Sequence, residues 1–299
     1  MKISIVIPVW NGAEFLRKNT SALLDAKNNK KNNITEIIMV DDSSSDDSVE
    51  FISQYDGQIR LIKHTKNRGF AATVNRGVSY AKGSLICLLN QDIIVSKNFL
   101  EKITTHFEDN KVFAVGLHEM GYGPAIGYFS DGFFQHKNQG EKNEVTQSMW
   151  ASGGSAVFRK KIWKKLKGLD EVLFSPFYWE DVDISYRAYK RGFKVLWEPD
   201  SHVVHKHESS INKDNFKLRK INFIKERNYL LFNWKNITSK KLFAEHKYYL
   251  IKRIFSHPGY LRVVLAALKR YQDVKRLRKR ELRYSKVSDE AIYASFYLK

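Results

Sequence analysis

Short apolar runs alternate with helical patterns over residues 1–110, and this alternation constrains the fold more than any other feature. The runs cover residues 3–9, 36–40, 59–62 and 85–89. The first is nearly continuous, as expected for a strand that is covered on both faces, and the third is weaker. The segments between them carry apolar residues at helical spacing. We therefore predict an α/β fold with a central, mostly parallel sheet and helices on both faces.

The remaining elements follow from the same periodicities. Ser96 is a typical capping residue, and apolar positions up to Phe107 predict a helix from 96 to 107. Glycine and aromatic residues without periodicity over 116–150 predict loops and short antiparallel strands. The other predicted elements are helices at 11–25, 46–52, 71–81 and 179–190, strands at 156–159 and 193–197, and a mostly helical last third.

Polar clusters follow two of the predicted strands. Asp41 and Asp42 come directly after the second apolar run, and Asn90, Gln91 and Asp92 come after the fourth. In parallel sheets the ligand lies beyond the carboxyl ends of the strands. The first pair could accept hydrogen bonds from a nucleobase and a ribose, or form an Asx turn or a helix cap. Asp92 suits Mg²⁺ or Mn²⁺ carrying a diphosphate, or belongs to a turn.

Three carboxylates stand where an aromatic stretch meets an amphipathic helix. Glu180, Asp181 and Asp183 follow the aromatic residues 177–179. Carboxylates in the first helical turn often serve only as partners of the helix dipole. An aromatic wall, however, raises the pKa of a carboxyl and suits it to act as a general base. Both interpretations stay open on the sequence alone.

Histidines gather after the strand predicted at 193–197. His202, His205 and His207 lie close together in the sequence. An imidazole from this group could complete a metal or diphosphate site begun by Asp92. The alternative is a set of surface histidines.

Positive charge is concentrated in the last third of the chain. Lys and Arg number 51 against 32 Asp and Glu, a formal net charge of +19, of which residues 1–210 carry +3 and residues 211–299 carry +16. This asymmetry indicates a polyanionic partner, either a membrane surface or nucleic acid. Because no nucleic-acid-binding module is recognisable, nucleic acid is not expected.

An apolar stretch in this basic region suggests a location. Residues 260–268 are apolar along one stretch and are flanked by basic pairs at 252–253 and 269–270, which predicts peripheral binding to an anionic membrane. The alternatives are a solvated helical pair or a dimer contact.

No apolar run approaches the ~20 residues that cross a bilayer. The opening run stops at Pro8 and is expected to be a strand, not a signal peptide, and the single cysteine, Cys87, fits a cytoplasmic protein, at most peripheral on the inner membrane face.

Six short motifs occur together in one order. They are Val6-Ile7-Pro8-Val9-Trp10-Asn11, the run from Val40 to Asp46, Asn67-Arg68-Gly69-Phe70 with Asn75-Arg76-Gly77, Leu88-Leu89-Asn90-Gln91-Asp92, Ala151-Ser152-Gly153-Gly154, and Trp179-Glu180-Asp181-Val182-Asp183. In this order the chain resembles the family 2 glycosyltransferases, and in particular a rhamnosyltransferase-like subgroup. Asn90 stands where the family's DxD motif has its first Asp.

The resemblance implies roles for individual residues. It implies the nucleotide-diphospho-sugar transferase (GT-A) fold, Asp181 as catalytic base with Glu180 in reserve, and Mg²⁺ or Mn²⁺ held by Asp92 and His205. Nucleotide-binding residues would be Pro8, Trp10, Asn11, Asp41, Asp42, Asn67, Gly69, Asn75 and Gln91. Acceptor-binding residues would be Gly153, Gly154 and Trp179.

The resemblance also implies a domain plan. Residues 1–235 would form the catalytic domain, with a nucleotide-binding half at 1–110 and an acceptor-binding half at 111–235. Residues 236–299 would form a basic, helical C-terminal extension.

The implied function is inverting transfer of a sugar from a nucleotide-diphosphate donor. The donor would be dTDP-rhamnose or a UDP-hexose, and the acceptor a saccharide or lipid-linked saccharide in cell-surface polysaccharide synthesis. One alternative, a sugar-nucleotide nucleotidyltransferase, needs a glycine- and arginine-rich loop after the first strand, which residues 8–12 lack. Another is a non-catalytic, membrane-associated scaffold. Neither a GxGxxG motif after the first strand nor a P-loop occurs.

Overall fold

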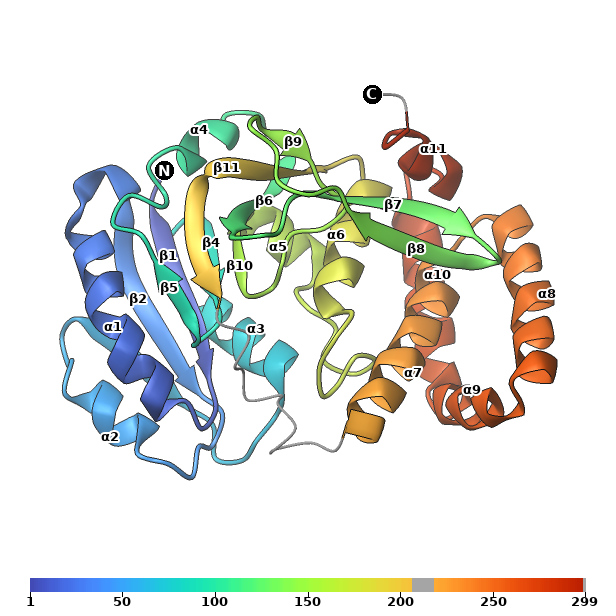
Figure 1. Cartoon of the computed structure of the whole chain (residues 1–299), viewed down its shortest axis with the longest axis horizontal. Coiled ribbons are helices and arrows are strands. Elements are labelled where there is room, and N and C mark those ends of the chain that lie inside the picture. Colours follow the sequence, from blue (N-terminus) through green and yellow to red (C-terminus); the bar gives the residue numbers. More distant parts are fainter. Residues whose placement is uncertain (206–217, 298–299) are drawn as a thin grey trace.

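The computed structural model describes residues 1–205 and 218–297 of the chain. Within these residues a nine-stranded sheet has the strand order β3-β2-β1-β4-β10-β6-β11-β5, with β9 pairing to β11, and β7 and β8 form a separate hairpin (Figure 1). The strands are β1 (Ile3–Val9), β2 (Ile34–Asp41), β3 (Ile59–Lys63), β4 (Leu85–Leu89), β5 (Ile93–Val95), β6 (Val112–Glu119), β7 (Ala125–Ser130), β8 (Phe133–Asn138), β9 (Thr146–Gln147), β10 (Ser155–Arg159) and β11 (Lys194–His205).

Helices connect these strands and make up the C-terminal region. They are α1 (Ala13–Asn28), α2 (Ser48–Ser53), α3 (Phe70–Tyr80), α4 (Ile103–His106), α5 (Lys160–Leu166), α6 (Glu180–Lys190), α7 (Leu218–Asn236), α8 (Lys240–Ser256), α9 (Leu261–Leu268), α10 (Tyr271–Tyr284) and α11 (Asp289–Ala294), with short 3-10 turns η1 (Lys30–Asn32) and η2 (Pro258–Tyr260). None of the helices within the described residues is both long and apolar enough to cross a membrane.

The sheet is covered on both faces, as predicted. Alternate side chains of β1 point to opposite sides, so Ile5 and Ile7 share one buried cluster with Leu16 of α1, while Val6 shares another with Val74 of α3. These side chains are at most 4% exposed. The prediction of an α/β fold with both faces buried is confirmed.

Strand β10 brings the two halves of the sheet together. The strands β1 to β4 are parallel to one another, whereas β10 runs antiparallel to both β4 and β6. Ser155 therefore pairs with Leu89, so that β10 begins where β4 ends. This reversal places the glycine pair at 153–154 beside the polar cluster at 90–92.

Two predicted elements differ from the structure. The helix predicted from 96 to 107 is reduced to the four residues of α4, preceded by turns. The Asn32 side chain donates to the Lys97 carbonyl oxygen and accepts from the Leu100 backbone N–H, and these bonds hold the segment in turns. The strand predicted at 193–197 continues to His205, because a register shift after Trp197 accommodates the segment with Pro199.

The C-terminal helices share the main core. Val263 and Ala267 of α9, Val274 of α10 and Ile292 of α11 are at most 7% exposed and belong to the same cluster as Val6. Helices α9, α10 and α11 therefore pack on the body of the protein. The predicted boundary at residue 235 stays a prediction.

Candidate active site

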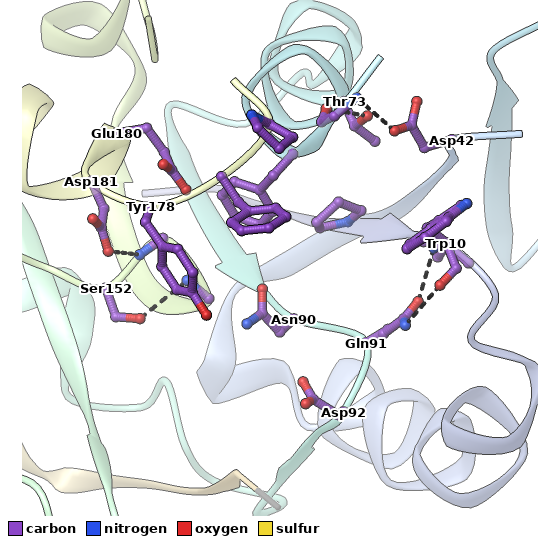
Figure 2. A pocket seen from close by; sticks show the side chains of 18 of the residues that line it. Trp10, Asp42, Thr73, Asn90, Gln91, Asp92, Ser152, Tyr178, Glu180 and Asp181 are labelled. Atoms are coloured by element: carbon purple, nitrogen blue, oxygen red, sulfur yellow. Dashed lines mark hydrogen bonds between the residues drawn. The ribbon is translucent and has the colours of Figure 1, made fainter. Parts of the chain in front are cut away.

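A cavity of about 520 Å³ lies at the carboxyl ends of β1 and β4. Asp92, at the end of β4, and Asp181, at the start of α6, both line it. Figure 2 shows Glu180 and Asp181 on the opposite side of this pocket from Trp10 and Asp42. The predicted site residues that line it are Pro8, Trp10, Asp42, Asn67, Gly69, Gln91, Asp92, Gly153, Gly154, Glu180, Asp181 and His205.

Gln91 fixes the turn that follows β1. Its Oε1 accepts a hydrogen bond from the backbone N–H of Trp10 at 3.0 Å, and its Nε2 donates to the Trp10 carbonyl oxygen at 3.2 Å. A Cβ at Gly12 would lie 2.1 Å from Gln91 Oε1, so a side chain there would displace this amide. The sequence Trp10-Asn11-Gly12 therefore folds around Gln91, which sets the position of the Trp10 ring at the cavity wall.

Asp42 organises another part of the wall that contains Trp10. Its Oδ1 accepts from Arg68 N at 2.8 Å and pairs with His64 Nδ1 at 2.9 Å, while its Oδ2 accepts from Gly69 N at 2.8 Å. Gly69 has a φ of +83°, in the left-handed region that a side chain disfavours. Asp42 and Gly69 together shape the loop that presents Asn67 to the cavity.

Four predicted site residues do not line this cavity. Asp41 accepts from the backbone N–H groups of Ser43 and Ser44 at 3.1 and 3.2 Å, which is the Asx turn considered as its alternative. Asn11 Oδ1 accepts from Ser45 N at 2.8 Å. Two others face different surroundings: Asn75 bonds to the backbone of Leu169, and Trp179 lines a neighbouring pocket.

Asp92 forms a chain of charged groups with His205 and Glu119. Asp92 Oδ1 lies 3.2 Å from His205 Nε2, and His205 Nδ1 lies 3.1 Å from Glu119 Oε2. Burial acts to lower the pKa of His205, but the two carboxylates outweigh it and raise that pKa to about 9. Asp92 Oδ2 is buried without a hydrogen-bond partner among the described residues. An unsatisfied buried oxygen in a cavity suits a cationic ligand.

The site contains two side chains that could bind a metal ion, Asp92 and His205. Over residues 1–205 and 218–297 the structure contains no cluster of three or more metal-ligating side chains. Asp92 and His205 nevertheless fit Mg²⁺ or Mn²⁺, because such ions commonly take one or two protein ligands together with substrate phosphates and water. Glu119 would orient the imidazole as an outer partner.

The other predicted histidines do not reach this site. The His202 ring packs on the ring of His118, with centroids 4.7 Å apart, outside the cavity lining. His207 lies outside the described residues.

Asp181 is held by backbone groups at the start of α6. Its Oδ2 accepts from Gly153 N at 3.3 Å and its Oδ1 from Val182 N at 2.8 Å. Burial raises the pKa of Asp181 in spite of these bonds, and the Glu119 charge adds to the increase. Burial also raises the pKa of Glu180 well above its ordinary range, with the neighbouring Asp181 charge acting in the same direction.

Asp183 has a different role from its neighbours. It is 0% exposed, its Oδ2 accepts from Arg187 Nε at 2.7 Å, and its Oδ1 lies 2.8 Å from Lys235 Nζ. The third carboxylate of the predicted cluster therefore joins α6 to α7 and faces away from the cavity lining.

The glycine pair closes on Asn90. A Cβ at Gly154 would lie 2.4 Å from Asn90 Nδ2, and the Gly154 carbonyl oxygen accepts from Asn90 N at 2.8 Å. The pair thus lets β10 approach β4, and Gly153 orients Asp181. From the sequence no role is assigned to eight lining residues, of which the first four stand within the recognised motifs: Val9, Phe70, Asn90, Ser152, Thr73, Pro176, Phe177 and Tyr178.

Asn228 and Arg227 of α7 hold the loop that carries Tyr178. Asn228 Nδ2 lies 3.0 Å from the Phe174 carbonyl oxygen and 2.9 Å from that of Phe177, and an Arg227 NH2 group donates to the Ser175 carbonyl oxygen at 2.6 Å. The sequence does not reveal this role, because the carbonyl groups that these side chains bind reach α7 only in the folded chain.

A second pocket adjoins the first. It has a volume of about 480 Å³ and shares Tyr178 and Asp181 with the first cavity. Its other walls come from β8, α6, α7 and Trp150, with Phe134, Gln135, His136, Trp150, Trp179, Val182, Lys225, Glu226 and Tyr229. Asp181 therefore stands between two cavities.

Comparison with known sequences gives a family match and several relatives. The profile described as "Glycosyl transferase family 2" matches residues 4–167. A pre-mycofactocin glycosyltransferase of Mycobacterium tuberculosis is 25% identical over 217 residues, 70% of this chain and 43% of that protein, so the chain spans less than half of that relative. Glycosyltransferase GlyG of Streptococcus pneumoniae is 27% identical, with 72% and 74% covered. The O-antigen chain rhamnosyltransferase WbaN of Salmonella anatum is 25% identical, with 68% and 66% covered.

Solved structures share the fold. The mannosyltransferase PcManGT of Pyrobaculum calidifontis, in complex with GDP-Man and Mn²⁺, aligns with a TM-score of 0.57 and 13% identity over 99% of this chain and 87% of that one. TarS of S. aureus, in complex with UDP-GlcNAc, aligns with a TM-score of 0.58 and 17% identity over 86% and 73%. These matches confirm the expected GT-A fold.

Proposed function

The chain belongs to glycosyl transferase family 2, whose members transfer a sugar from a nucleotide sugar, and we propose that it is an inverting enzyme that uses Asp181 as its general base. The observation that carries this proposal is the position of Asp181 between two adjoining cavities, with Asp92 in the first of them. The first cavity would hold the nucleotide-diphosphate donor and the second the acceptor.

The reaction follows from this arrangement. Asp181 would take the proton of the acceptor hydroxyl, whose oxygen forms a bond to the anomeric carbon while the bond from that carbon to the diphosphate breaks and leaves its electron pair on the diphosphate. One displacement from the face opposite the leaving group inverts the configuration. The raised pKa of Asp181 strengthens it as a base. Burial raises the pKa of Glu180 and thereby favours its protonated form, which would donate a hydrogen bond to a substrate oxygen.

Asp92 and His205 would hold a divalent cation at the diphosphate. When bound, such a cation neutralises the negative charge that develops on the leaving group. Asp92 supplies a buried carboxylate oxygen, and His205 is oriented by Glu119. PcManGT was solved with Mn²⁺, which supports the assignment.

The finer substrate assignments rest on the relatives. WbaN is named a rhamnosyltransferase, which supports dTDP-rhamnose as donor, and TarS was solved with UDP-GlcNAc, which supports a UDP-hexose. The acceptor would be a saccharide or lipid-linked saccharide hydroxyl in cell-surface polysaccharide synthesis, with the protein at the inner face of the cell membrane. Residues 1–110 would bind the nucleotide and residues 111–235 the acceptor. Two adjoining cavities at Asp181 favour the transfer of a sugar between two substrates over the alternatives of a nucleotidyltransferase or a non-catalytic scaffold.

Transfer assays on two variants test the proposal. We expect Asp181→Asn to lower kcat by about 10²–10⁴-fold while nucleotide-diphosphate binding, measured by thermal shift with Mn²⁺, is retained. Asp92→Ala should instead lose the Mn²⁺-dependent part of nucleotide binding. Asp131→Asn is the matched control, because Asp131 is exposed and its φ of 51° suits asparagine. Full transfer by both active-site variants would overturn the proposal.

A further inference from the structure

The outward face of α8 is apolar and basic. Tyr248, Ile251 and Phe255 recur at helical spacing and are 64%, 56% and 81% exposed. Lys247 and Lys252, both exposed, adjoin them on the same side of the helix. The opposite side is buried through residues that include Leu242 and His246. An exposed strip of this kind on a helix that is anchored by its other face is an unpartnered surface.

Helix α9 repeats this pattern after the η2 turn. Leu261, Leu265 and Leu268 stand at positions i, i+4 and i+7 and are 45%, 52% and 46% exposed, while Val263 and Ala267 face the core. The exposed Lys269 lies beside the leucine strip. Two consecutive helices thus present apolar strips with basic flanks. We call their exposed residues the α8–α9 surface: Lys247, Tyr248, Ile251, Lys252, Phe255, Leu261, Leu265, Leu268 and Lys269.

The positive charge of residues 240–270 indicates which kind of partner this surface binds. Residues 240–270 contain eight Lys and Arg and one acidic residue, Glu245, so 8 − 1 gives a net charge of +7. Apolar side chains ringed by lysine and arginine match the interface of an anionic bilayer, where the apolar groups enter the acyl boundary and the basic groups meet the headgroups.

Pockets that share lining residues occur at the active site and beside this surface. The second cavity, which contains Asp181, is also lined by Glu226, and Glu226 lines a third pocket with Arg253, His257 and Tyr260. Arg253 NH2 lies 2.9 Å from Glu226 Oε2 and the Arg253 guanidinium lies over the Tyr260 ring. Tyr260 directly precedes α9. In Figure 1, α9 and the start of α7 lie along the same edge of the molecule as the carboxyl end of β2.

We propose that the α8–α9 surface docks on an anionic membrane, and that the acceptor is accordingly a sugar carried on an anionic lipid, which would extend from the second cavity past Arg253 towards the bilayer. The docking stands on the exposed residues alone, whereas the acceptor class rests on the proposed function. The sequence placed the membrane contact at 260–268; the structure adds the strip on α8 with Phe255.

Vesicle flotation tests the docking without any catalysis. We expect the full chain to float with vesicles of phosphatidylcholine and phosphatidylglycerol and to stay behind with phosphatidylcholine alone. The pair Phe255→Ser with Leu265→Ser should abolish flotation, and Lys247→Glu with Lys252→Glu should weaken it by at least about five-fold per lysine. Matched controls are Met120→Ser, which replaces a side chain that is 74% exposed elsewhere, and Lys30→Glu with Lys142→Glu. The controls should float like the wild type.

Three results would overturn the proposal. They are equal recovery with neutral and anionic vesicles, flotation that survives both α8–α9 surface variants, and variants that change only the oligomeric state in light scattering or only the binding of duplex DNA. Transfer to a water-soluble acceptor should be unaffected by the Phe255→Ser and Leu265→Ser pair. A variant that no longer floats but still transfers sugar to a soluble acceptor would support docking by this surface. Loss of transfer in the wild type would instead count against the proposed reaction.

Discussion

At the scale of single residues, burial of the Glu180 carboxyl makes the stability of the protein depend on pH. It is 6% exposed, and its Oε2 has no hydrogen-bond partner among the described residues. Burial and the adjacent Asp181 raise its pKa well above the ordinary value of 4.5. The folded state therefore binds the Glu180 proton more tightly than the unfolded chain does. Between the ordinary pKa and the raised one, the free energy of unfolding must fall as the pH rises.

Replacing Glu180 tests this linkage. We expect Glu180→Gln to be more stable than the wild type at neutral pH, and the difference to shrink as the pH falls towards 4.5. Thermal unfolding measured across this pH range gives the comparison. Glu50→Gln, at an exposed position, is the control and should follow the wild type at every pH. A gap between Glu180→Gln and the wild type that stays constant with pH would contradict the argument.

The sequence allowed the position of some residues at the cavity to be predicted, and not that of others. Asp92 and Asp181 follow from motif order, because the end of a strand and the start of a helix place such residues at the ligand edge of the sheet. Asn11, Asp41 and Asn75 also occur in the recognised motifs, yet their side chains form hydrogen bonds to backbone groups outside the cavity. Which way a polar side chain turns depends on unpaired N–H groups that meet only in the folded chain, and sequence order does not record them.

At the scale of elements, α7 acts as a support for the loop between Phe174 and Tyr178. We expect Asn228→Ala to free the carbonyl oxygens of Phe174 and Phe177, to destabilise the protein by about 1–3 kcal/mol, and to raise KM more than it lowers kcat, because Tyr178 lines both cavities. Steady-state kinetics and denaturant unfolding measure the two effects. A variant with unchanged KM and reduced stability would reduce Asn228 to a purely structural residue.

The elements themselves were largely predictable where a strand or helix is apolar on a fixed period. β4 begins and ends at the residues expected, Leu85 and Leu89. The segment from 96 to 107 has the apolar spacing of a helix and buries those side chains, yet Asn32, some 65 positions earlier, diverts its backbone. A long-range side-chain bond of this kind overrides local periodicity and has no local signature.

At the scale of the whole molecule, one buried carboxylate links the C-terminal helices to α6. Asp289 of α11 is 0% exposed, lies 2.6 Å from Lys190 Nζ, and accepts from the Tyr186 hydroxyl and from Ser239 N, both at 2.6 Å. Lys190 itself is only 1% exposed. Removing the carboxylate would leave a buried ammonium uncompensated.

We expect Asp289→Ala to destabilise the protein by about 3–5 kcal/mol, the usual cost of breaking a buried ion pair. Denaturant unfolding of the full chain measures the change. Glu290→Ala, which removes the adjacent exposed carboxylate, should cost less than about 1 kcal/mol. Equal losses for the two variants would show that the C-terminal helices contribute no specific anchor to α6.

The two cavities that meet at Asp181 draw most of their walls from different parts of the chain. The first takes walls from the ends of β1 and β4, and the second from the β8 strand and α7. Residues of β8 line the second cavity, whereas none of the residues that line the first comes from β7 or β8. With the donor and acceptor cavities assigned as proposed, we expect an exchange of β7 and β8 between homologues to change the acceptor while the donor stays the same.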